Sequence, residues 1–557
     1  MTQHTDGAPQ RHPSLSEPAT LVLIAVLCVF GAIIGMQLLV SLGITANTSL
    51  IGALAAMALA RVPLAIFARY RSIHVQNLAQ SAISSATFGA ANSLLLPVGI
   101  PWLLGRPDLV LPMLAGAFFA MLLDAYLLYR MFDSRVFPAT GAWPPGVAAA
   151  EAIKAGDEGG RKAVLMGVGF GTGVAVSFIK IPLAWIGFAG STAVTGIPMS
   201  AFGVAFIGNI WALSMFGIGL LLRGYSGPIF GGPAFASIIP KGDLMAAYIP
   251  HGFMIGAGIV ALIQVALLLF RRNEAQRQAD ASAGVSDREV KRALGLGTIG
   301  YLVIAVFIAI VGGLMSEMSP GMLLLFVLYA AFAAYVHELI VGLAAMHSGW
   351  FPAFAVALIT LIIGMLLGFP MPALALLVGF SAATGPAFAD MGYDLKAGYL
   401  LRGNGADPAF ELDGRRQQLF AAMFAFVVAG LVVLLSYQSY FDQNLVAPVD
   451  KVYAATIKAG VAPGVAWQLF LWAIPGAILQ FLGGPKRQIG VLFATGLLIN
   501  FPMAGWAVLA GIVCRLIWEK LRGATGEGDM EVFAAGIIAG DAIFSFFDSV
   551  SKNVFKR

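Results

Sequence analysis

Long apolar segments follow one another along almost the whole chain, separated by short polar gaps. In the first half they cover residues 20–42, 44–68, 109–130, 163–187, 197–222 and 246–270. Many are close to the roughly 20 residues that a helix needs to cross a hydrocarbon layer about 30 Å thick. With a second series downstream, the pattern predicts an all-α polytopic membrane protein with about 14 to 16 transmembrane segments, some of them broken or re-entrant.

The second series covers residues 323–346, 352–367, 372–401, 418–435, 468–482, 488–515 and 532–547. Residues 294–314 form a further span that joins the two series. Residues 223–245 are rich in Gly and Pro and lack the clean apolar length of a span. They are compatible with a re-entrant loop.

Residues 74–104 depart from this pattern because they are rich in Gln, Asn, Ser and Gly and contain Pro97 and Pro101. Such a segment is too polar to face lipid, so it must pack inside the bundle or line a water-filled cavity. Residues 379–401 are the matching polar, broken segment of the second series.

Short sequence matches indicate that the chain is a duplication. AAEAIKAG at residues 149–156 is echoed by YAATIKAG at 453–460, which is 304 residues later, and 197–199 matches 501–503 at the same offset. Residues 252–259 match 536–543 at an offset of 284. The predicted divisions are a polar tail (1–18), a first repeat (19–270), a cytoplasmic linker (271–293), a joining span (294–320), a second repeat (321–550) and a basic tail (551–557).

Composition agrees with a membrane protein, because 59% of the 557 residues are apolar and 11% are charged, against about 25% charged in soluble domains. The net charge is +5, and most of the Lys and Arg residues lie in short gaps between apolar segments, where the topology of membrane proteins places them. This argues against nucleic-acid binding. The positive charge of the linker and of the C-terminal tail predicts cytoplasmic termini in a multi-pass protein of the cell (inner) membrane.

Two matching broken segments are the best sequence pointer to the substrate site of a transporter. The candidate substrate-binding residues are Gln76, Asn77 and Gln80 in the first segment and Thr384, Asp390, Asp394 and Lys396 in the second. The 304-residue offset takes Gln80 onto Thr384. The alternative is that the amide side chains only hold helices together.

Ionisable side chains inside apolar segments cost roughly 2.5 to 3.5 kcal/mol to insert and usually mark a pathway. Glu338, Asp541 and Asp124 are the candidates for proton coupling, because protonation removes most of the cost of burying a carboxylate. A structural ion pair, for example with Lys180, is the competing interpretation.

No metal site or cofactor is expected. His74, His251, His337 and His347 lack the close spacing of a helical zinc site. The sequence contains no Gly-x-x-x-x-Gly-Lys-Ser/Thr loop, so an ion gradient is the remaining energy source. No paired nucleophile favours an enzyme, whereas a channel or an exporter would share this composition.

Residues 141–160 predict a short charged helix that begins near Pro144 and Pro145 and ends before Gly159 and Gly160. Glu151 and Lys154 on this helix, and Lys458 on its second copy, are interpreted as gate or structural residues.

The stretch GAWPPGVAAAEAIKAGDEGG at 141–160 resembles the Pro-x-Gly-x-Ala-x-Ala-Glu-x-x-Lys-Ala motif of the oligopeptide transporter family, which includes the yellow-stripe-like branch. DLKAGYL at 394–400, RRQQ at 415–418, FAAGIIAGD at 533–541 and QNLAQS at 76–81 are similar to further motifs of that family, in the same order. Ala397 stands where the family has Thr, Asp541 where it usually has Glu, and the Asn-Pro-Gly motif is absent. The chain resembles a bacterial-type member.

The resemblance implies proton-coupled symport of small peptides. Uptake of metal-chelate complexes, siderophore or nicotianamine-like, is the alternative, and a channel or exporter comes after it. The expected partners are the solute, protons and the lipid bilayer, with a homodimer as one possible assembly.

Overall fold

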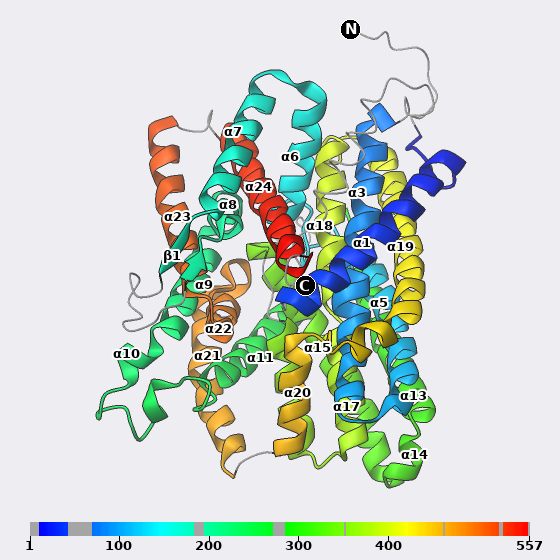
Figure 1. Ribbon diagram of the computed structural model, residues 1–557, viewed down its shortest axis with the longest axis vertical. Coiled ribbons are helices and arrows are strands. Elements are labelled where there is room, and N and C mark those ends of the chain that lie inside the picture. Colours follow the sequence, from blue (N-terminus) through cyan, green and yellow to red (C-terminus); the bar gives the residue numbers. More distant parts are fainter. Residues whose placement is uncertain are drawn as a thin grey trace.

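The computed structural model describes residues 11–42, 70–182, 194–270, 284–349, 353–460, 463–522 and 527–554. The predicted span at 44–68 and most of the linker lie outside these ranges. The described chain is almost entirely helical, with one two-stranded sheet of β1 (Lys180–Pro182) and β2 (Val194–Gly196). The all-α prediction is therefore confirmed (Figure 1).

The first half contains α1 (Pro18–Leu42), α3 (Ile73–Phe88), the π-helical turn η2 (Gly89–Leu95), α4 (Leu96–Leu103), η3 (Pro107–Leu109), α5 (Val110–Met131), α6 (Pro144–Glu158), α7 (Gly160–Ser177), α8 (Met199–Ile207), α9 (Ile210–Gly224), α10 (Ser226–Phe230), η5 (Pro240–Gly242) and α11 (Ile249–Phe270). The second half contains α13 (Asp287–Val311), α14 (Leu314–Glu317), α15 (Pro320–Ser348), α16 (Ala353–Leu366), α17 (Met371–Ala383), α18 (Pro386–Leu401), α19 (Pro408–Asp442), α20 (Pro448–Ala459), α21 (Val465–Arg487), α22 (Ile489–Leu498), α23 (Pro502–Arg522) and α24 (Glu527–Val554).

Nine helices of the described ranges are long and apolar enough to cross a membrane, counting α3 to α4 and α17 to α18 as one each. Large apolar side chains such as Phe332, Leu435 and Phe481 are exposed on their outer faces. A bilayer would cover these side chains, as expected of a multi-pass membrane protein.

The polar segment α3–η2–α4 is buried from Val75 to Pro101, as its composition predicted. Its helix changes pitch at η2, where the Leu96 amide donates to the Ala91 carbonyl five residues earlier. Pro97 follows directly and cannot donate to the preceding turn. The matching segment of the second half breaks between α17 and α18 at Gly385, whose φ of +91° favours glycine.

Two predicted spans are in fact pairs of shorter helices. Residues 197–222 form α8 and α9, because Gly208 is extended and the Asn209 side chain accepts hydrogen bonds from the backbone amides at the start of α9. Residues 488–515 form α22 and most of α23, and Pro502 begins the second helix. Residues 223–245 contain the end of α9 and the short helices α10 and η5, and they are mostly exposed.

Helices from the two halves pack against one another in reciprocal pairs. Helix α7 lies along α24, α11 lies along α21, α9 packs on α22 and α8 packs on α23. Helix α6 packs on α18, whereas α20 packs on α4. In Figure 1, α6 lies in the upper part of the molecule and α20 in the lower part.

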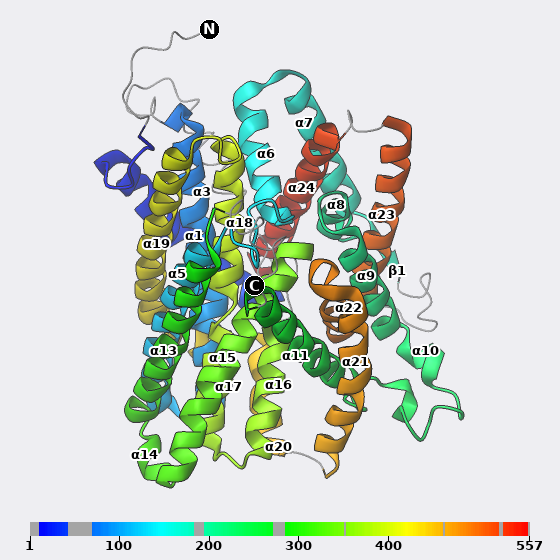
Figure 2. The same cartoon turned by 180° about the vertical axis from the view of Figure 1, so that it is seen from behind.

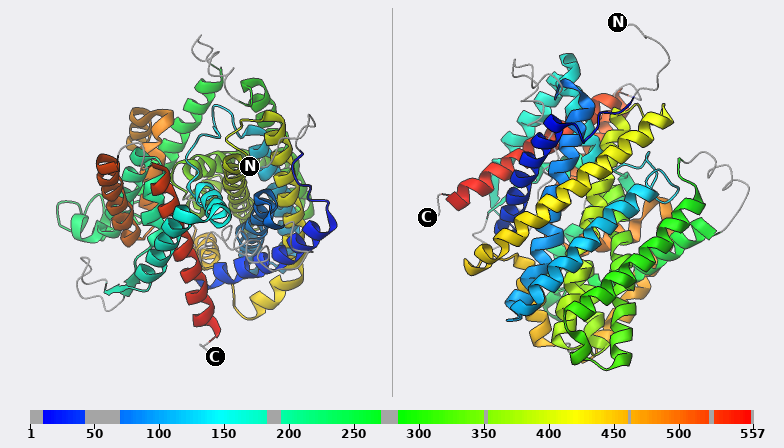
Figure 3. Two further views of the ribbon diagram at one scale, coloured as in Figure 1. Left: turned by 90° about the horizontal axis from the view of Figure 1, so that it is seen from above. Right: turned by 90° about the vertical axis from the view of Figure 1, so that its right-hand side faces the viewer.

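The remaining long helices flank these pairs. Helix α13 packs between α5 and α15. In Figure 2, which shows the molecule from behind, α13 lies at the outside of the bundle. Helix α24 extends obliquely from the other helices at one side, as the right-hand view of Figure 3 shows in red. The bundle is therefore built from helices of widely different tilt.

Glycines allow the reciprocal pairs to approach closely. A Cβ on Gly169 or Gly173 of α7 would overlap the carbonyl oxygens of Phe533 and Ile537 on α24. A Cβ on Gly167 or Gly171, on the other face of α7, would meet nothing within 4 Å. Small residues are the usual packing device between helices in lipid.

We therefore expect Gly169→Ala and Gly173→Ala to lower the apparent Tm of the detergent-purified protein, because overpacking costs about 1 to 3 kcal/mol. The matched controls Gly167→Ala and Gly171→Ala should leave the Tm unchanged or raise it slightly, because alanine favours the helix more than glycine does. Equal effects of both pairs would show that α7 and α24 do not pack in this register.

Candidate functional site

Five polar side chains link the buried faces of α3 and α18. The Gln80 Nε2 donates to Asp394 Oδ1 at 2.6 Å, and the Ser84 hydroxyl donates to Asp390 Oδ1 at 2.5 Å. Ser85 lies 3.2 Å from Asp390 Oδ2 and 3.4 Å from Asp394 Oδ2. Acids spaced four residues apart on α18 thus meet donors on one face of α3.

The other predicted residues of these segments are also buried. Asn77 donates to Gln80 Oε1 at 2.9 Å, and Gln76 donates to the Tyr70 carbonyl at 2.8 Å. The Thr384 hydroxyl is bonded at the break before α18, where it donates to the carbonyl of Ser381 at 2.9 Å. The network joins Asn77, Gln80, Asp390 and Asp394, and it leaves Gln76 and Thr384 with separate partners.

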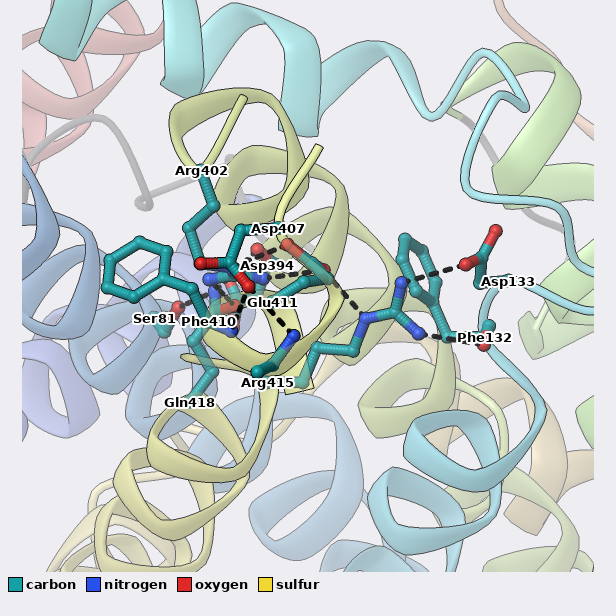
Figure 4. Close-up of polar contacts among 11 residues, drawn as sticks. Ser81, Phe132, Asp133, Asp394, Arg402, Asp407, Phe410, Glu411, Arg415 and Gln418 are labelled. Atoms are coloured by element: carbon teal, nitrogen blue, oxygen red, sulfur yellow. Dashed lines mark hydrogen bonds and ion pairs between the residues drawn. The ribbon is translucent and has the colours of Figure 1, made fainter. Parts of the chain in front are cut away.

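A buried cluster of Arg402, Glu411 and Arg415, hereafter the Arg–Glu–Arg cluster, holds the α18–α19 connection (Figure 4). The Arg402 Nε lies 2.7 Å from Glu411 Oε2, and the Arg415 Nε lies 2.7 Å from Glu411 Oε1. Arg415 also pairs with Asp133 at 3.0 Å, which ties the loop after α5 to α19. One carboxylate between two guanidiniums satisfies both of its oxygens.

Gln418 connects the Arg–Glu–Arg cluster to the α3–α18 network. Its Nε2 donates to Ser81 Oγ at 3.0 Å and to the Asp394 carbonyl at 2.6 Å, while its Oε1 accepts from Arg402 at 2.8 Å. Figure 4 shows these side chains converging on the end of α18. Arg415 and Gln418, the first and last residues of the RRQQ stretch at 415–418, therefore lie in one continuous network.

The segment before α1 lies against the same end of α19. The backbone amide of His12 donates to Asp413 Oδ2 at 3.1 Å, and its ring lies 5.4 Å from that of Phe410. Burial lowers the pKa of His12 from 6.5 to about 4. The ring is therefore neutral at physiological pH, where it packs as an aromatic side chain.

A cavity of about 540 Å³ lies beside α18. It is lined by Arg135, Val136, Pro138, Thr140, Gly141, Ala142, Val147, Ile207, Gly208, Asn209, Leu343, Met346, His347, Lys396, Pro485, Lys486, Gln488 and Glu531. Three of these side chains are Arg or Lys and one is Glu. Arg135 is paired with Asp287 at 2.8 Å, so the excess positive charge of the wall comes from Lys396 and Lys486. Cavities of this size hold small solutes.

Of the predicted substrate-binding residues, Lys396 lines this cavity, and its Nζ donates to the Ala139 carbonyl at 2.9 Å. Gln80, Asp390 and Asp394 are not among its lining residues. The reason is helical geometry: Lys396 follows Asp394 by two residues, or about 200° around the helix. Helix α18 therefore presents its acids to α3 and its lysine to the cavity.

Two of the predicted proton-coupling residues meet at Tyr301 of α13. Its hydroxyl lies 2.5 Å from Asp124 Oδ1 and 3.0 Å from Glu338 Oε2, and all three side chains are buried. Asp124 Oδ2 accepts the Gly385 amide at 2.8 Å, at the break before α18. Residues 124, 301 and 338 form a single cluster, hereafter the Asp–Tyr–Glu cluster.

Asp541 lies apart from the Asp–Tyr–Glu cluster, on α24. It accepts hydrogen bonds from the Ser177 hydroxyl at 2.5 Å and from the amide and hydroxyl of Ser200, at the start of α8. Lys180 is exposed in β1, and its Nζ lies 5.4 Å from the ring centre of Phe544. The hydrogen bonds of Asp541 are therefore with serines and a helix N-terminus.

The predicted gate residues lie on the short helices as expected. Glu151 and Lys154 of α6 form an ion pair at 2.9 Å, and α6 begins at Pro144 and ends before Gly159. Lys458 of α20 donates to the Leu103 carbonyl at 3.1 Å, at the end of α4.

No group of three or more His, Cys, Asp or Glu side chains within the described ranges could hold a metal ion. His337 contacts the Ser381 hydroxyl at 3.1 Å, and His347 contacts the carbonyls of Leu343 and Lys486. These two histidines therefore take part in contacts between residues of the bundle.

Three residues of these clusters were not predicted from the sequence: Arg402, Glu411 and Tyr301. Arg402 and Glu411 lie in or beside a short gap between spans, where charges are ordinary topology signals. Tyr301 lies in an otherwise apolar span. A hydroxyl in such a span was the only available signal, because its partners are 177 and 37 residues away.

A family model described as OPT oligopeptide transporter protein matches residues 18–552, which is nearly the whole chain. No curated protein matches the chain.

The Arg–Glu–Arg cluster predicts a stability effect. Glu411→Gln should destabilise the protein by about 3 kcal/mol, because it leaves two buried guanidiniums without their shared carboxylate. Thermal unfolding of the purified protein measures this loss. Glu158→Gln, in an exposed pair with Lys162, is the control and should change nothing measurable. A Glu411→Gln protein as stable as this control would contradict the assignment.

Proposed function

Because this chain belongs to the OPT oligopeptide transporter family and is a multi-pass transporter of oligopeptides or related solutes, we propose that it carries small peptides inward together with protons. The observation that carries this proposal is the Asp–Tyr–Glu cluster. It joins two buried acids to the break before α18, the helix that also contributes Lys396 to the cavity.

The proton requirement follows from counting hydrogens. The Tyr301 hydroxyl has one hydrogen and contacts a carboxyl oxygen on each side. Only one contact can use that hydrogen, so a hydrogen bond at the other needs a proton on Asp124 or Glu338. Neither acid forms an ion pair in the described part of the chain. The shared hydroxyl hydrogen and the lack of a countercharge support the proposal that Asp124 and Glu338 together bind and release one proton.

Helix α18 provides the connection between proton and solute. Asp124 accepts the Gly385 amide just before the first turn of α18, and Lys396 follows 11 residues later, about 16 Å along the helix at 1.5 Å per residue. Protonation of Asp124 weakens its hold on the Gly385 amide, because a neutral carboxyl is a poorer acceptor. We infer that this changes the position of α18 and of Lys396 in the cavity.

The cavity supports a solute with carboxylates. Among its described lining residues Glu531 is the one acid, whereas Lys396 and Lys486 are basic, and Arg135 is paired with Asp287. A peptide fits this chemistry through its C-terminal carboxylate. A metal bound to a small amino-carboxylate chelator has the same anionic groups and is the second candidate. A channel would not require the buried acids, and the direction of transport distinguishes a proton-coupled exporter from this proposal.

Alternating access is proposed from the duplication. The reciprocal packing of α7 on α24 and α11 on α21 supports two equivalent halves. Helix α6 contacts α18, and α20 contacts α4. These contacts support a role for Glu151 and Lys154 as gate residues at one end of the bundle and for Lys458 as a gate residue at the other. Gln76, Asn77, Gln80, Thr384, Asp390 and Asp394 are then reached by solute when α3 and α18 separate. Asp541 is proposed as a further proton-coupling residue beside α8.

The protein is placed in the cell (inner) membrane in this proposal, with both termini in the cytoplasm. The support is the positive charge of the linker and of the C-terminal tail.

The proton role is tested in proteoliposomes with a peptide selected by thermal-shift screening of di- to hexapeptides. Glu338→Gln and Tyr301→Phe should abolish accumulation driven by an acid outer pH. Exchange of labelled for unlabelled peptide, which needs no net proton movement, should continue. The control Glu317→Gln, at the exposed end of α14, should accumulate peptide normally. Undiminished accumulation by Glu338→Gln would refute the proton role.

The cavity role is tested through the carboxylate of the solute. Lys396→Ala should raise the KM for a peptide by about tenfold, which corresponds to the roughly 1.4 kcal/mol of one charge-assisted contact. A peptide with an amidated C-terminus should lose this difference between wild type and variant. Competition by iron, nickel or copper chelates in the same assay would favour the second candidate, and an unchanged KM would exclude Lys396 as a contact.

A further inference from the structure

A buried acid outside these clusters has no hydrogen-bond partner. Asp450 lies in the first turn of α20 and is fully buried. Neither of its carboxyl oxygens has a hydrogen-bond partner in the described part of the chain. Its backbone amide donates to the Ala447 carbonyl at 3.0 Å. The side chain is therefore buried without the contacts that normally accompany a buried acid.

The helices packed against α20 offer no countercharge. These are α4, α16 and α17, and none of the three sequences contains a titratable side chain. On α20 itself, Tyr453 is also buried, but its hydroxyl donates to the Phe354 carbonyl at 2.6 Å. Lys451 is exposed, and Lys458 is bonded to Leu103 at the other end of the helix. On these four helices an ionised Asp450 would therefore have no countercharge, only the partial positive charge of the α20 N-terminus, and its burial would cost several kcal/mol.

The packing of α4 leaves room for this carboxyl group. A Cβ on Gly99 would overlap Asp450 Oδ2, so the acid occupies the space that a larger residue would fill. Away from this buried contact, Lys458 holds the end of α4 through one exposed hydrogen bond. Because Asp450 is buried against α4, separation of α20 from α4 would expose its carboxyl group to water.

The second copy of the motif does not explain the acid by packing. The 304-residue offset takes Gly146 of α6 onto Asp450 of α20. Gly146 lies directly against the Tyr393 carbonyl of α18, where no side chain fits. The corresponding position of the first copy therefore has no acid, so the short helix does not require one here.

We propose that Asp450 is an additional proton site of the transporter, which holds its proton while α20 lies on α4 and exchanges it when the two helices separate. This inference rests on the proposed proton-coupled function. It adds a site on the helix pair that is related by the duplication to α6 and α18. The ligand is a proton, because the described surroundings hold no further side-chain ligands for a metal cation.

The protonation state is tested directly by infrared difference spectroscopy of the full-length protein in lipid at neutral pH. The wild-type minus Asp450→Asn spectrum should contain the carbonyl stretching band of a protonated carboxyl group. The matched control Asp442→Asn replaces an exposed acid at the end of α19 and should give no such band. Absence of the band from the Asp450 difference spectrum would overturn the proposal.

The coupling role is tested with the proteoliposome assay. Asp450→Asn should accumulate peptide only to the equilibrium level under an acid outer pH, while peptide exchange continues and loses its pH dependence. Gly99→Ala, which presses on the carboxyl group without removing it, should shift that pH dependence. Normal accumulation by Asp450→Asn, together with its loss in Glu338→Gln, would overturn this inference and leave the proposed function intact. Accumulation by wild type that follows a sodium gradient at constant pH would refute both.

Discussion

A single hydroxyl hydrogen stands between the carboxyl groups of Asp124 and Glu338, and the other features of this account depend on that constraint. Tyr301 holds both acids within hydrogen-bond distance, and burial denies them water as an alternative partner. A hydrogen bond on each side needs one further proton. The backbone amide of Gly385 ties this protonation to the break between α17 and α18. A change in protonation can thereby reach a helix that faces both the cavity and α3.

Helix α18 separates two chemical environments. Its acids face the donors of α3, where Gln418 and the Arg–Glu–Arg cluster hold the end of the helix. Its lysine faces the positively charged cavity. The cluster is expensive to bury and rigid once its hydrogen bonds are complete, so it provides a fixed point against which the first turn of α18 can move. In this account, solute and proton act on opposite ends of one helix.

Sequence patterns predicted the parts of this structure that depend on local chemistry. Pro144, Pro145 and Gly159 gave the bounds of α6, and the polarity of residues 74–104 predicted their burial. The breaks at Gly208 and before Pro502 were missed, because only one Asn, Asn209 at the first break and Asn500 at the second, interrupts each apolar segment. Asp390 and Asp394 were expected at a cavity, whereas helical phase turns them toward α3 and leaves Lys396 beside it.

Contacts between distant residues were beyond prediction from one sequence. Asp124 and Glu338 each stood out as charges in apolar segments, but nothing in their spacing indicated that they share Tyr301. Arg402 and Glu411 resembled ordinary charges of a loop. Asp450 lay in a short polar helix, where an acid draws no attention until its neighbours are known to be apolar.

The measurement that tests the central claim most directly is the reversal of peptide flux in proteoliposomes at fixed membrane potential, as the pH gradient is varied. If protons and peptide move together, the peptide gradient at which net flux is zero must shift with the pH gradient in a constant ratio. A zero-flux point that stays at equal peptide concentrations, whatever the pH gradient, would contradict the account.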